Sequence, residues 1–126
     1  MNMIKIKYIL QLFVLVFLLS SCYKMRVEVT HVPSNTPADA DIYITGEFND
    51  WDAGDENYKL EKLSDSVYFI DLPRGIGELE YKFTRGDWTT VEKDNCGYEI
   101  DNRMLRFSGD SSLVSTTILS WADLDP

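Results

Sequence analysis

Tryptophan is the residue type in this chain with the most evident binding chemistry. Trp51 follows Asn49 and Asp50, Trp88 follows a Gly-Asp turn, and Trp121 ends an apolar run. Flat aromatic rings beside hydrogen-bonding side chains suit ligands that carry both apolar C–H faces and hydroxyl groups, as sugars do. Tryptophan is also common in the cores of small β domains, so spacing alone does not decide whether Trp51 and Trp88 lie on the surface or in the core. We expect Trp121 to be structural.

The residues needed for catalysis are scarce. His31 is the single histidine, so a Ser-His-Asp relay has one possible base and a multi-histidine metal site cannot form. Carboxylates gather in the polar segment 92–101, but no second catalytic motif accompanies them. The acidic run 50–57 lacks the spacing and closing Glu of an EF-hand loop. We therefore expect no enzyme activity, no metal site and no cofactor.

Length and charge limit the possible partners. The chain has 126 residues, with 12 Lys and Arg against 21 Asp and Glu, and a formal net charge of −9. One domain fits this length. Binding to a phosphate backbone requires an excess of Lys and Arg, so nucleic acid is not an expected partner.

The first 21 residues have the layout of an export signal. Lys5 and Lys7 precede the apolar run 8–19, and two serines lead to Cys22. The apolar run is too short to span a bilayer. The segment 19–22, Leu-Ser-Ser-Cys, resembles a bacterial lipobox, in which cleavage precedes an acylated Cys. This resemblance predicts a signal peptide over 1–21, a lipid anchor on Cys22 and a place in the cell envelope. The outer membrane is the expected location, and the sequence does not decide between its periplasmic and its outer side.

The second cysteine cannot form an intramolecular disulfide once Cys22 is acylated. Cys96 lies in a turn-forming Asn-Cys-Gly sequence, so we expect it to be an exposed free thiol.

The remainder of the chain has the pattern of short strands. Residues 25–30 alternate apolar and polar side chains, and turn sequences rich in Gly, Pro, Asn and Asp separate the later runs. The strands are expected at 25–30, 42–46, 58–63, 67–72, 79–85, 88–93, 103–107 and 114–121. This spacing predicts an all-β fold, an antiparallel immunoglobulin-like β-sandwich of seven or eight strands, with 22–126 as a single domain. Tyr43, Tyr68 and Tyr81 are expected in its core.

The segment 79–93 is predicted to form a β-hairpin, and the length of its turn decides which side chains share a face. A two-residue turn would place Trp88 on the face of Tyr81 and Phe83. A three-residue turn at 85–87 instead pairs Thr84 with Trp88. We favour the second register, although it sets Glu80 opposite Glu92, because it separates a core face from a solvated face. The core face would hold Leu79, Tyr81, Phe83 and Val91, and the solvated face Lys82, Thr84, Trp88 and Thr90.

Four segments in order resemble a starch-binding carbohydrate-binding module of family twenty and the related glycogen-binding domain of the AMP-activated kinase β subunit. They are 42–51 (IYITGEFNDW), 72–75 (LPRG), 80–88 (EYKFTRGDW) and 101–103 (DNR). The similarity covers about residues 26–121.

The resemblance implies roles for five residues. Trp51 and Trp88 would stack on glucose rings, Lys82 and Asn102 would bind glucose hydroxyls, and Glu92 is an acidic residue expected near the site. The second sugar site of the family has no clear counterpart. Tyr58 and Tyr68 are the nearest aromatic residues, and neither is assigned.

The expected function is non-catalytic binding of α-glucans such as starch, glycogen and maltooligosaccharides by a lipid-anchored envelope protein. Enzymes that degrade α-glucans, or importers, are the expected partners. The alternative is a protein-interaction module of an envelope complex, with a partner covering the aromatic pair, because one fold hosts many functions.

Overall fold

A computed structural model describes residues 24–107 and 112–126, which form nine strands, three short 3-10 helices and no α-helix. The order along the chain is β1 (Lys24–His31), β2 (Tyr43–Gly46), η1 (Glu47–Asn49), η2 (Glu56–Tyr58), β3 (Glu61–Lys62), β4 (Tyr68–Pro73), β5 (Glu78–Thr84), η3 (Trp88–Thr90), β6 (Glu92–Lys93), β7 (Arg103–Arg106), β8 (Leu113–Thr117) and β9 (Ser120–Trp121).

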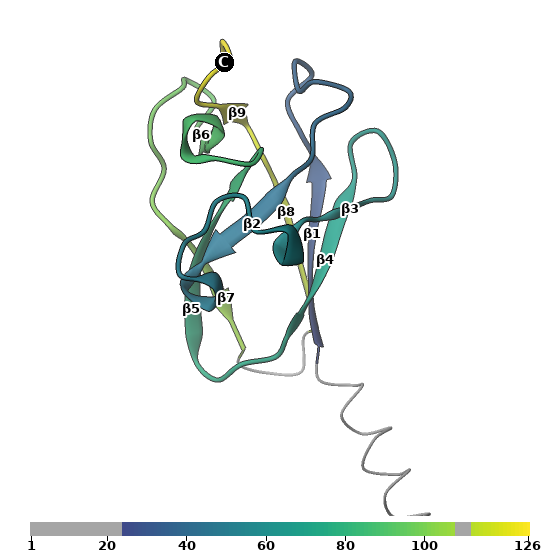
Figure 1. The fold of residues 1–126 in the computed structure, drawn as a ribbon, viewed down its shortest axis with the longest axis vertical. Helices are drawn as coiled ribbons and strands as arrows, with labels where there is room; N and C mark the ends of the chain where they lie inside the picture. Colours follow the sequence, from purple (N-terminus) through teal and green to yellow (C-terminus); the bar gives the residue numbers. More distant parts are fainter. Residues whose placement is uncertain (1–23, 108–111) are drawn as a thin grey trace, which may run out of the picture.

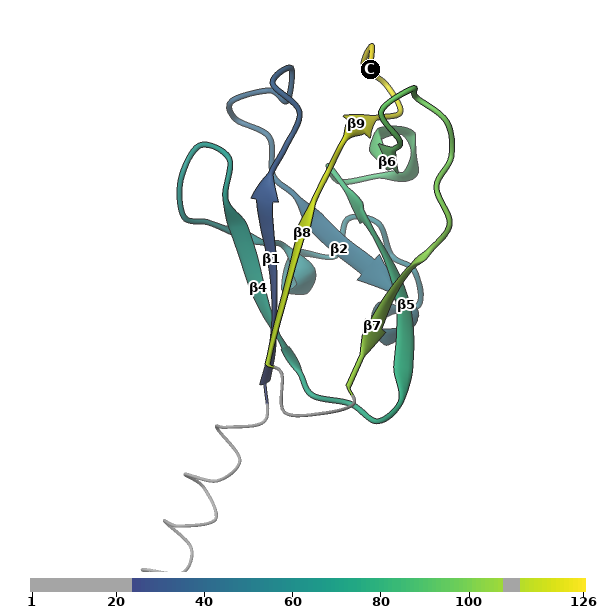
Figure 2. The same cartoon turned by 180° about the vertical axis from the view of Figure 1, so that it is seen from behind.

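The strands form two facing sheets and a two-stranded ribbon (Figures 1 and 2). One sheet has the order β3-β4-β1-β8, the other has the order β2-β5-β7, and β6 pairs with β9. All pairs are antiparallel except β1 with β8, which is parallel. The expected all-β sandwich is confirmed. The described residues form nine strands rather than the expected seven or eight, because the expected run 114–121 is divided into β8 and β9.

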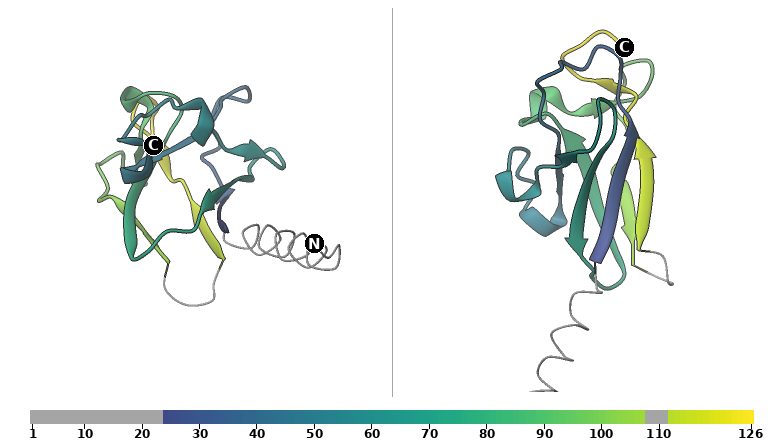
Figure 3. Two further views of the ribbon diagram at one scale, coloured as in Figure 1. Left: turned by 60° about the horizontal axis from the view of Figure 1, so that its bottom comes forward. Right: turned by 90° about the vertical axis from the view of Figure 1, so that its right-hand side faces the viewer.

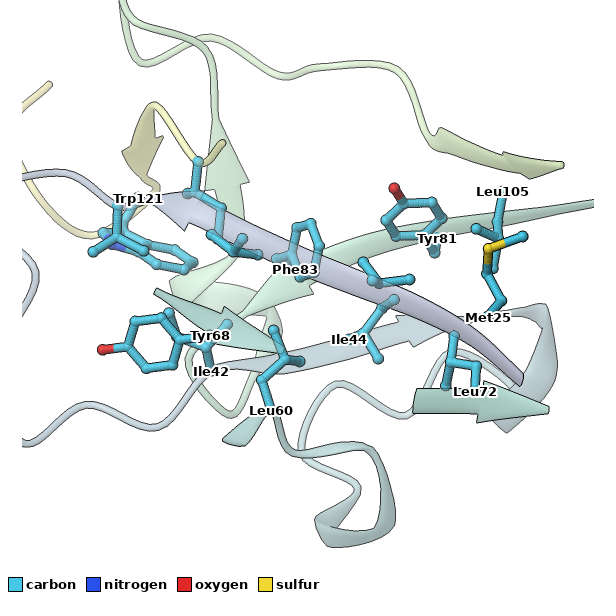
Figure 4. Packing of buried hydrophobic residues seen from close by; sticks show 14 of the residues in the cluster. Met25, Ile42, Ile44, Leu60, Tyr68, Leu72, Tyr81, Phe83, Leu105 and Trp121 are labelled. Carbon is cyan, nitrogen blue, oxygen red and sulfur yellow. The ribbon is translucent and has the colours of Figure 1, made fainter. Parts of the chain in front are cut away.

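The core lies between the two sheets (Figure 4). In β1 every second side chain is buried, with Met25, Val27 and Val29 facing inward, as the period of a strand requires. Phe83 of β5 and Leu105 of β7 face them from the other sheet. The sequence pattern of alternating apolar residues therefore supplies both halves of the core.

The aromatic residues expected in the core are buried there. Tyr43, Tyr68 and Tyr81 are all buried, which confirms that expectation. Trp121 is fully buried, and its indole Nε1 donates a hydrogen bond to Thr36 Oγ1 at 2.8 Å. Its expected structural role is confirmed, and the polar edge of its ring is satisfied as burial demands.

The expected hairpin over 79–93 is wrong. β5 pairs with β2 through residues 81–84 on one side and with β7 through residues 78–81 on the other. The segment after the turn instead forms η3, and β6 pairs with β9. Tyr81, Phe83 and Val91 are buried as expected, whereas Thr84 is buried rather than solvated.

The expected signal peptide over 1–21 and the lipid anchor on Cys22 lie outside the described residues. Among the residues described, no helix is both long enough and apolar enough to cross a bilayer. Cys96 is exposed and free, in agreement with the sequence.

Candidate functional site

Trp51 and Trp88 lie together, although 37 positions separate them in the sequence. Their ring centroids are 6.2 Å apart and the ring planes are inclined by 37°. Trp88 keeps 47% of its surface exposed, and Trp51 is half-buried. The structure thus resolves the open question of position, because both rings reach the surface as one aromatic pair.

The side chain of Asn49 organises the turn that carries Trp51. Asn49 Oδ1 accepts the backbone N–H of Gly46 at 3.0 Å, and Asn49 Nδ2 donates to the carbonyl of Asp52 at 3.1 Å. The backbone N–H of Trp51 donates to the carbonyl of Gly46 at 3.0 Å. Asn49 therefore links the strand before the turn to the segment after it. Asn49 stands in a sequence motif quoted above, but the sequence alone assigned it no role.

The backbone of this turn is strained. Asp50 and Trp51 have φ values of 53° and 58°, in the left-handed region that bulky residues rarely adopt. Such conformations cost on the order of 1–3 kcal/mol each and tend to occur at functional sites. The contacts of Asn49 maintain a conformation that directs Trp51 towards Trp88.

Trp88 is the first residue of η3, and Asp87 caps that helix. The side chain of Asp87 accepts the backbone N–H of Thr89 at 2.9 Å. Hydrogen bonds from the side chain and backbone of Thr89 lower the pKa of the Asp87 carboxyl from its ordinary value. The Gly-Asp turn that the sequence showed before Trp88 is thus a helix cap rather than a hairpin turn.

Two contacts bring the loops of Trp51 and Trp88 together. The hydroxyl of Thr84 donates to the carbonyl of Ala53 at 2.5 Å, and it accepts the backbone N–H of Gly86 at 3.2 Å. Gly54 packs directly on Gly86, since a Cβ added at Gly54 would lie 2.4 Å from the carbonyl oxygen of Gly86. Only glycine at position 54 permits this approach.

The outer side of β5 positions the whole site. Side chains alternate along a strand, so Glu80, Lys82 and Thr84 point away from the core while Tyr81 and Phe83 point into it. Thr84 fixes the loop after Trp51, as described above. Glu80 and Lys82 contact the segment that leads into β7. The sequence missed the roles of Glu80 and Thr84 because it placed the partner strand incorrectly.

Lys82 contacts the segment that leads into β7, and Asn102 lies in that segment. The ammonium of Lys82 donates to the carbonyl of Ile100 at 2.8 Å, which leaves further N–H donors on the same nitrogen. Asn102 is exposed, and its Nδ2 donates to a carboxylate oxygen of Glu80 at 3.1 Å. These contacts place both predicted hydrogen-bonding residues on the outer side of the sheet. Their binding roles stay predictions.

Glu92 requires a correction, because its carboxylate is not on the surface. Only 1% of Glu92 is exposed, and its two oxygens accept hydrogen bonds from Nε and Nη2 of Arg103 at 2.7–3.0 Å. Burial lowers the pKa of Arg103, but the hydrogen bonds and charge of Glu92 outweigh that effect and raise it. Glu92 has no surface to offer a ligand in this structure. In this structure the role of Glu92 is structural, as the ion-pair partner of Arg103.

Tyr58 and Tyr68, the unassigned aromatic residues, are separate from the Trp pair. Tyr68 is buried in the core. Tyr58 stacks on Phe48 with ring centroids 4.9 Å apart. This stack lines a small apolar hollow of about 100 Å³ together with Leu72, Pro73, Leu79 and Phe107.

The described residues contain no cluster of three or more His, Cys, Asp or Glu side chains placed to bind a metal ion. Two carboxylates of the acidic loop after Trp51 make local contacts. Asp52 accepts the backbone N–H of Gly54, and Asp55 accepts that of Asn57, each at 3.1 Å. These contacts are those of turns.

No family model matches the sequence. The chain is 45% identical over 94 residues to an alpha-amylase of Niallia circulans, a match that covers 73% of this chain and 7% of the relative. It is 34% identical over 105 residues to an amylopullulanase of Thermoanaerobacter thermohydrosulfuricus, covering 80% and 7%. It is 31% identical over 98 residues to an amylopullulanase of Thermoanaerobacterium thermosulfurigenes, covering 74% and 5%.

The aligned regions thus span about three quarters of this chain and only 5 to 7% of the length of these curated relatives. A sequence of this type recurs as a small part of much larger proteins.

Proposed function

We propose that the β-sandwich is a non-catalytic carbohydrate-binding module that binds α-glucan chains on the surface formed by Trp51 and Trp88. The observation that supports this most strongly is the pair of indole rings, 6.2 Å apart with Trp88 exposed and Trp51 half-buried, at positions far apart in sequence. Apolar faces of sugar rings stack on such planes. The proposed ligands are starch, glycogen and maltooligosaccharides.

The geometry of the pair suits a curved chain. Rings inclined by 37° contact two successive sugar units only when the chain turns between them. Chains of α-1,4-linked glucose curve in this way, whereas extended β-linked chains present flatter faces. In this proposal Lys82 and Asn102, on the outer side of the sheet, supply donors and acceptors for glucose hydroxyls.

The similarity to parts of an alpha-amylase and of amylopullulanases supports the same ligand class. The aligned segments are short parts of those proteins, which is consistent with a binding module attached to larger chains. The single histidine limits nucleophilic catalysis, and the excess of acidic residues favours solubility. The function proposed for this chain is therefore recognition of the glucan, with hydrolysis or import left to partner proteins.

We place this module in the cell envelope, on a lipid anchor at Cys22 that follows a signal peptide over 1–21. The support is the order of charged, apolar and small residues before Cys22. The domain would then comprise residues 22–126 and hold glucan chains near a membrane.

Titration calorimetry of the purified protein with maltoheptaose and with β-cyclodextrin tests the binding function. We expect dissociation constants on the order of 10 µM to 1 mM, because one small site buries little area. Replacing either tryptophan, Trp51→Ala or Trp88→Ala, should weaken binding at least about tenfold. Ile76→Ala, a change of an apolar residue that is 98% exposed in a different loop, is the matched control and should leave binding unchanged.

No heat with either ligand would overturn the proposal. In that case, recovery of a stoichiometric protein after mild crosslinking would favour the protein-interaction alternative, with the exposed Trp88 as part of the interface.

A further inference from the structure

Glu80, on the outer side of β5, lies between the turn that carries Trp51 and the segment that carries Asn102. β5 pairs with β2 as far as the rung of Gly46 with Tyr81. The chain leaves the sheet after Gly46 to form η1, and η1 and η2 lie on the side of the molecule away from β1 and β8 (Figure 3). Glu80 is therefore the residue of β5 next to the point where β2 ends.

The backbone of Glu80 is fixed from the side on which β2 ends. Oε2 of Glu47 accepts the backbone N–H of Glu80 at 3.0 Å, in place of the strand that has ended. Gly46 packs on the same residue, since a Cβ at position 46 would collide with the carbonyl oxygen of Glu80. The carbonyl of Gly46 also accepts the backbone N–H of Trp51 at 3.0 Å. The turn of Trp51 and the position of Glu80 thus depend on the same backbone.

The side chain of Glu80 fixes the orientation of the Asn102 amide. Asn102 is exposed, and its Nδ2 donates to Glu80 Oε2 at 3.1 Å. An ionised carboxylate can only accept hydrogen bonds, so the NH2 group of the amide must face it and the carbonyl oxygen Oδ1 points away from it. Within the described part of the chain, this Oδ1 receives no hydrogen bond. It is therefore free to accept one from a ligand.

Lys82, the next residue of β5 on the outer side, offers the complementary groups. Its ammonium donates to the carbonyl of Ile100 at 2.8 Å and keeps further N–H donors. Residues two positions apart on a strand lie about 7 Å apart on the same face. Donors from Lys82 and an acceptor from Asn102 therefore lie on one face, which suits a sugar because each of its hydroxyls both donates and accepts.

We propose that Glu80 is a positioning residue of the glucan site, which acts through Asn102. With its NH2 group bound to Glu80, Asn102 presents its carbonyl oxygen and accepts a hydrogen bond from one glucose hydroxyl, while Lys82 donates to another. Through its contact with Gly46, Glu80 also keeps these polar groups in a fixed relation to Trp51. This inference rests on the α-glucan binding proposed above.

Calorimetry of the purified protein with maltoheptaose tests the role of Glu80. Glu80→Met keeps the length of the side chain but removes the acceptor, so the Asn102 amide can turn either way and affinity should fall about three- to tenfold. Glu78→Met is the matched control, because Glu78 lies on the same face of β5 and pairs with the exposed Arg106. It should leave the affinity unchanged, and equal affinities of the two variants would overturn the proposal.

Two further variants separate a positioning role from a merely structural one. Glu80→Gln restores an acceptor oxygen at the same place, and its affinity should lie within about twofold of the wild type. In an Asn102→Ala background, Glu80→Met should lower the affinity by less than about twofold, because the residue through which Glu80 acts is gone. A full loss in Glu80→Gln, or an undiminished effect of Glu80→Met in the Asn102→Ala background, would overturn the proposal.

The Nδ2 protons of Asn102 report the orientation of the amide directly in NMR spectra of the isotope-labelled protein, where Asn102→Ala identifies their signals. One proton of the pair should lie downfield in the wild type, both free and saturated with maltoheptaose, and should move upfield in Glu80→Met. Loss of the downfield signal on saturation would show that the NH2 group turns towards the glucan, and this would overturn the proposal.

The same titrations distinguish the role of Glu80 from glucan binding itself. Absence of binding by the wild type would overturn both proposals. Binding that Trp88→Ala weakens and Glu80→Met leaves unchanged would overturn only the role of Glu80.

Discussion

Arg103 of β7 donates hydrogen bonds to both carboxylate oxygens of the buried Glu92. The same guanidinium donates to Thr116 Oγ1 at 2.6 Å and to the carbonyl of Thr117 at 2.8 Å, both in β8 of the other sheet. Glu92 also accepts the backbone N–H of Phe83 in β5 at 3.2 Å. One ion pair thus connects β5, β6, β7 and β8 beside the site.

Removal of one member of this pair should be costly. Glu92→Ala leaves a partly buried guanidinium without its counter-charge, and we expect the free energy of unfolding to fall by about 3–5 kcal/mol. Urea denaturation should show a lower midpoint with an unchanged slope. The control is Glu78→Ala, which breaks an exposed pair with Arg106 and should cost less than about 1 kcal/mol. Equal losses in the two variants would contradict the role of burial.

Gly54→Ala should separate the two tryptophans. The added Cβ would lie 2.4 Å from the carbonyl oxygen of Gly86, so the loops must move apart. We expect affinity for maltoheptaose to fall at least about tenfold in calorimetry, because stacking needs both rings in place. Gly77→Ala serves as the control. The added Cβ strains the backbone, because Gly77 has a positive φ, but it meets no other atom within 4 Å. The variant should therefore have a lower melting temperature and an unchanged affinity. Undiminished affinity in Gly54→Ala would show that the glycine contact does not position the site.

Lys82→Met should weaken glucan binding and loosen the segment 94–102. The substitution keeps the length of the apolar stem but removes the ammonium that donates to the carbonyl of Ile100. A hydrogen bond from a charged donor contributes about 1.5–3 kcal/mol, so we expect an affinity loss of roughly tenfold or more. Hydrogen exchange of the amides in 94–102 should also become faster. The exposed Lys59 offers a control, since Lys59→Met should change neither glucan affinity nor exchange in that segment.

Tyr43 should make stability depend on pH in alkaline solution. Its hydroxyl donates to Glu56 Oε1 at 2.7 Å, and this bond to a carboxylate, with burial, raises the pKa of Tyr43 to about 12. A tyrosine in the unfolded chain titrates near about 10. The raised value means that the contribution of Tyr43 is complete below pH ~10 and is lost as the pH rises to ~12.

Urea denaturation of the wild type and of Tyr43→Phe between pH 8 and pH 12 measures this effect. The difference in free energy of unfolding should be largest at pH 8 and should shrink as pH 12 is approached. A difference that stays constant over this range would contradict the assignment, since the phenol would then not titrate with folding.

The strands of the two facing sheets could be predicted from the sequence, because apolar side chains recur at strand spacing between turn sequences, although β2 is buried at all four positions. β1 shows this most clearly, with Met25, Val27 and Val29 buried. The two-residue strands lie within the expected runs 58–63, 88–93 and 114–121, but their pairing partners could not be predicted, because strand pairing depends on how the whole core packs. Glu92 of β6 is the clearest example, since its strand pairs with β9 and its charge with Arg103.

The candidate site could likewise be predicted only in part from the sequence. Trp51, Trp88, Lys82 and Asn102 could be selected from residue type and motif order. Their arrangement could not be predicted, because the favoured hairpin register placed Thr84 in solvent. In the structure Thr84 is buried and its hydroxyl holds the loop after Trp51.

The sequence by itself determined which face of each long strand is buried and which residue types are available for binding. Tertiary structure decided that β5 lies between β2 and β7, which directs Glu80, Lys82 and Thr84 to the neighbouring loops. It also decided that Trp51 and Trp88 form a pair, through the contact of Gly54 with Gly86. The physical reason is that side-chain alternation is a local property of a strand, whereas the partner on each edge depends on how the whole core packs.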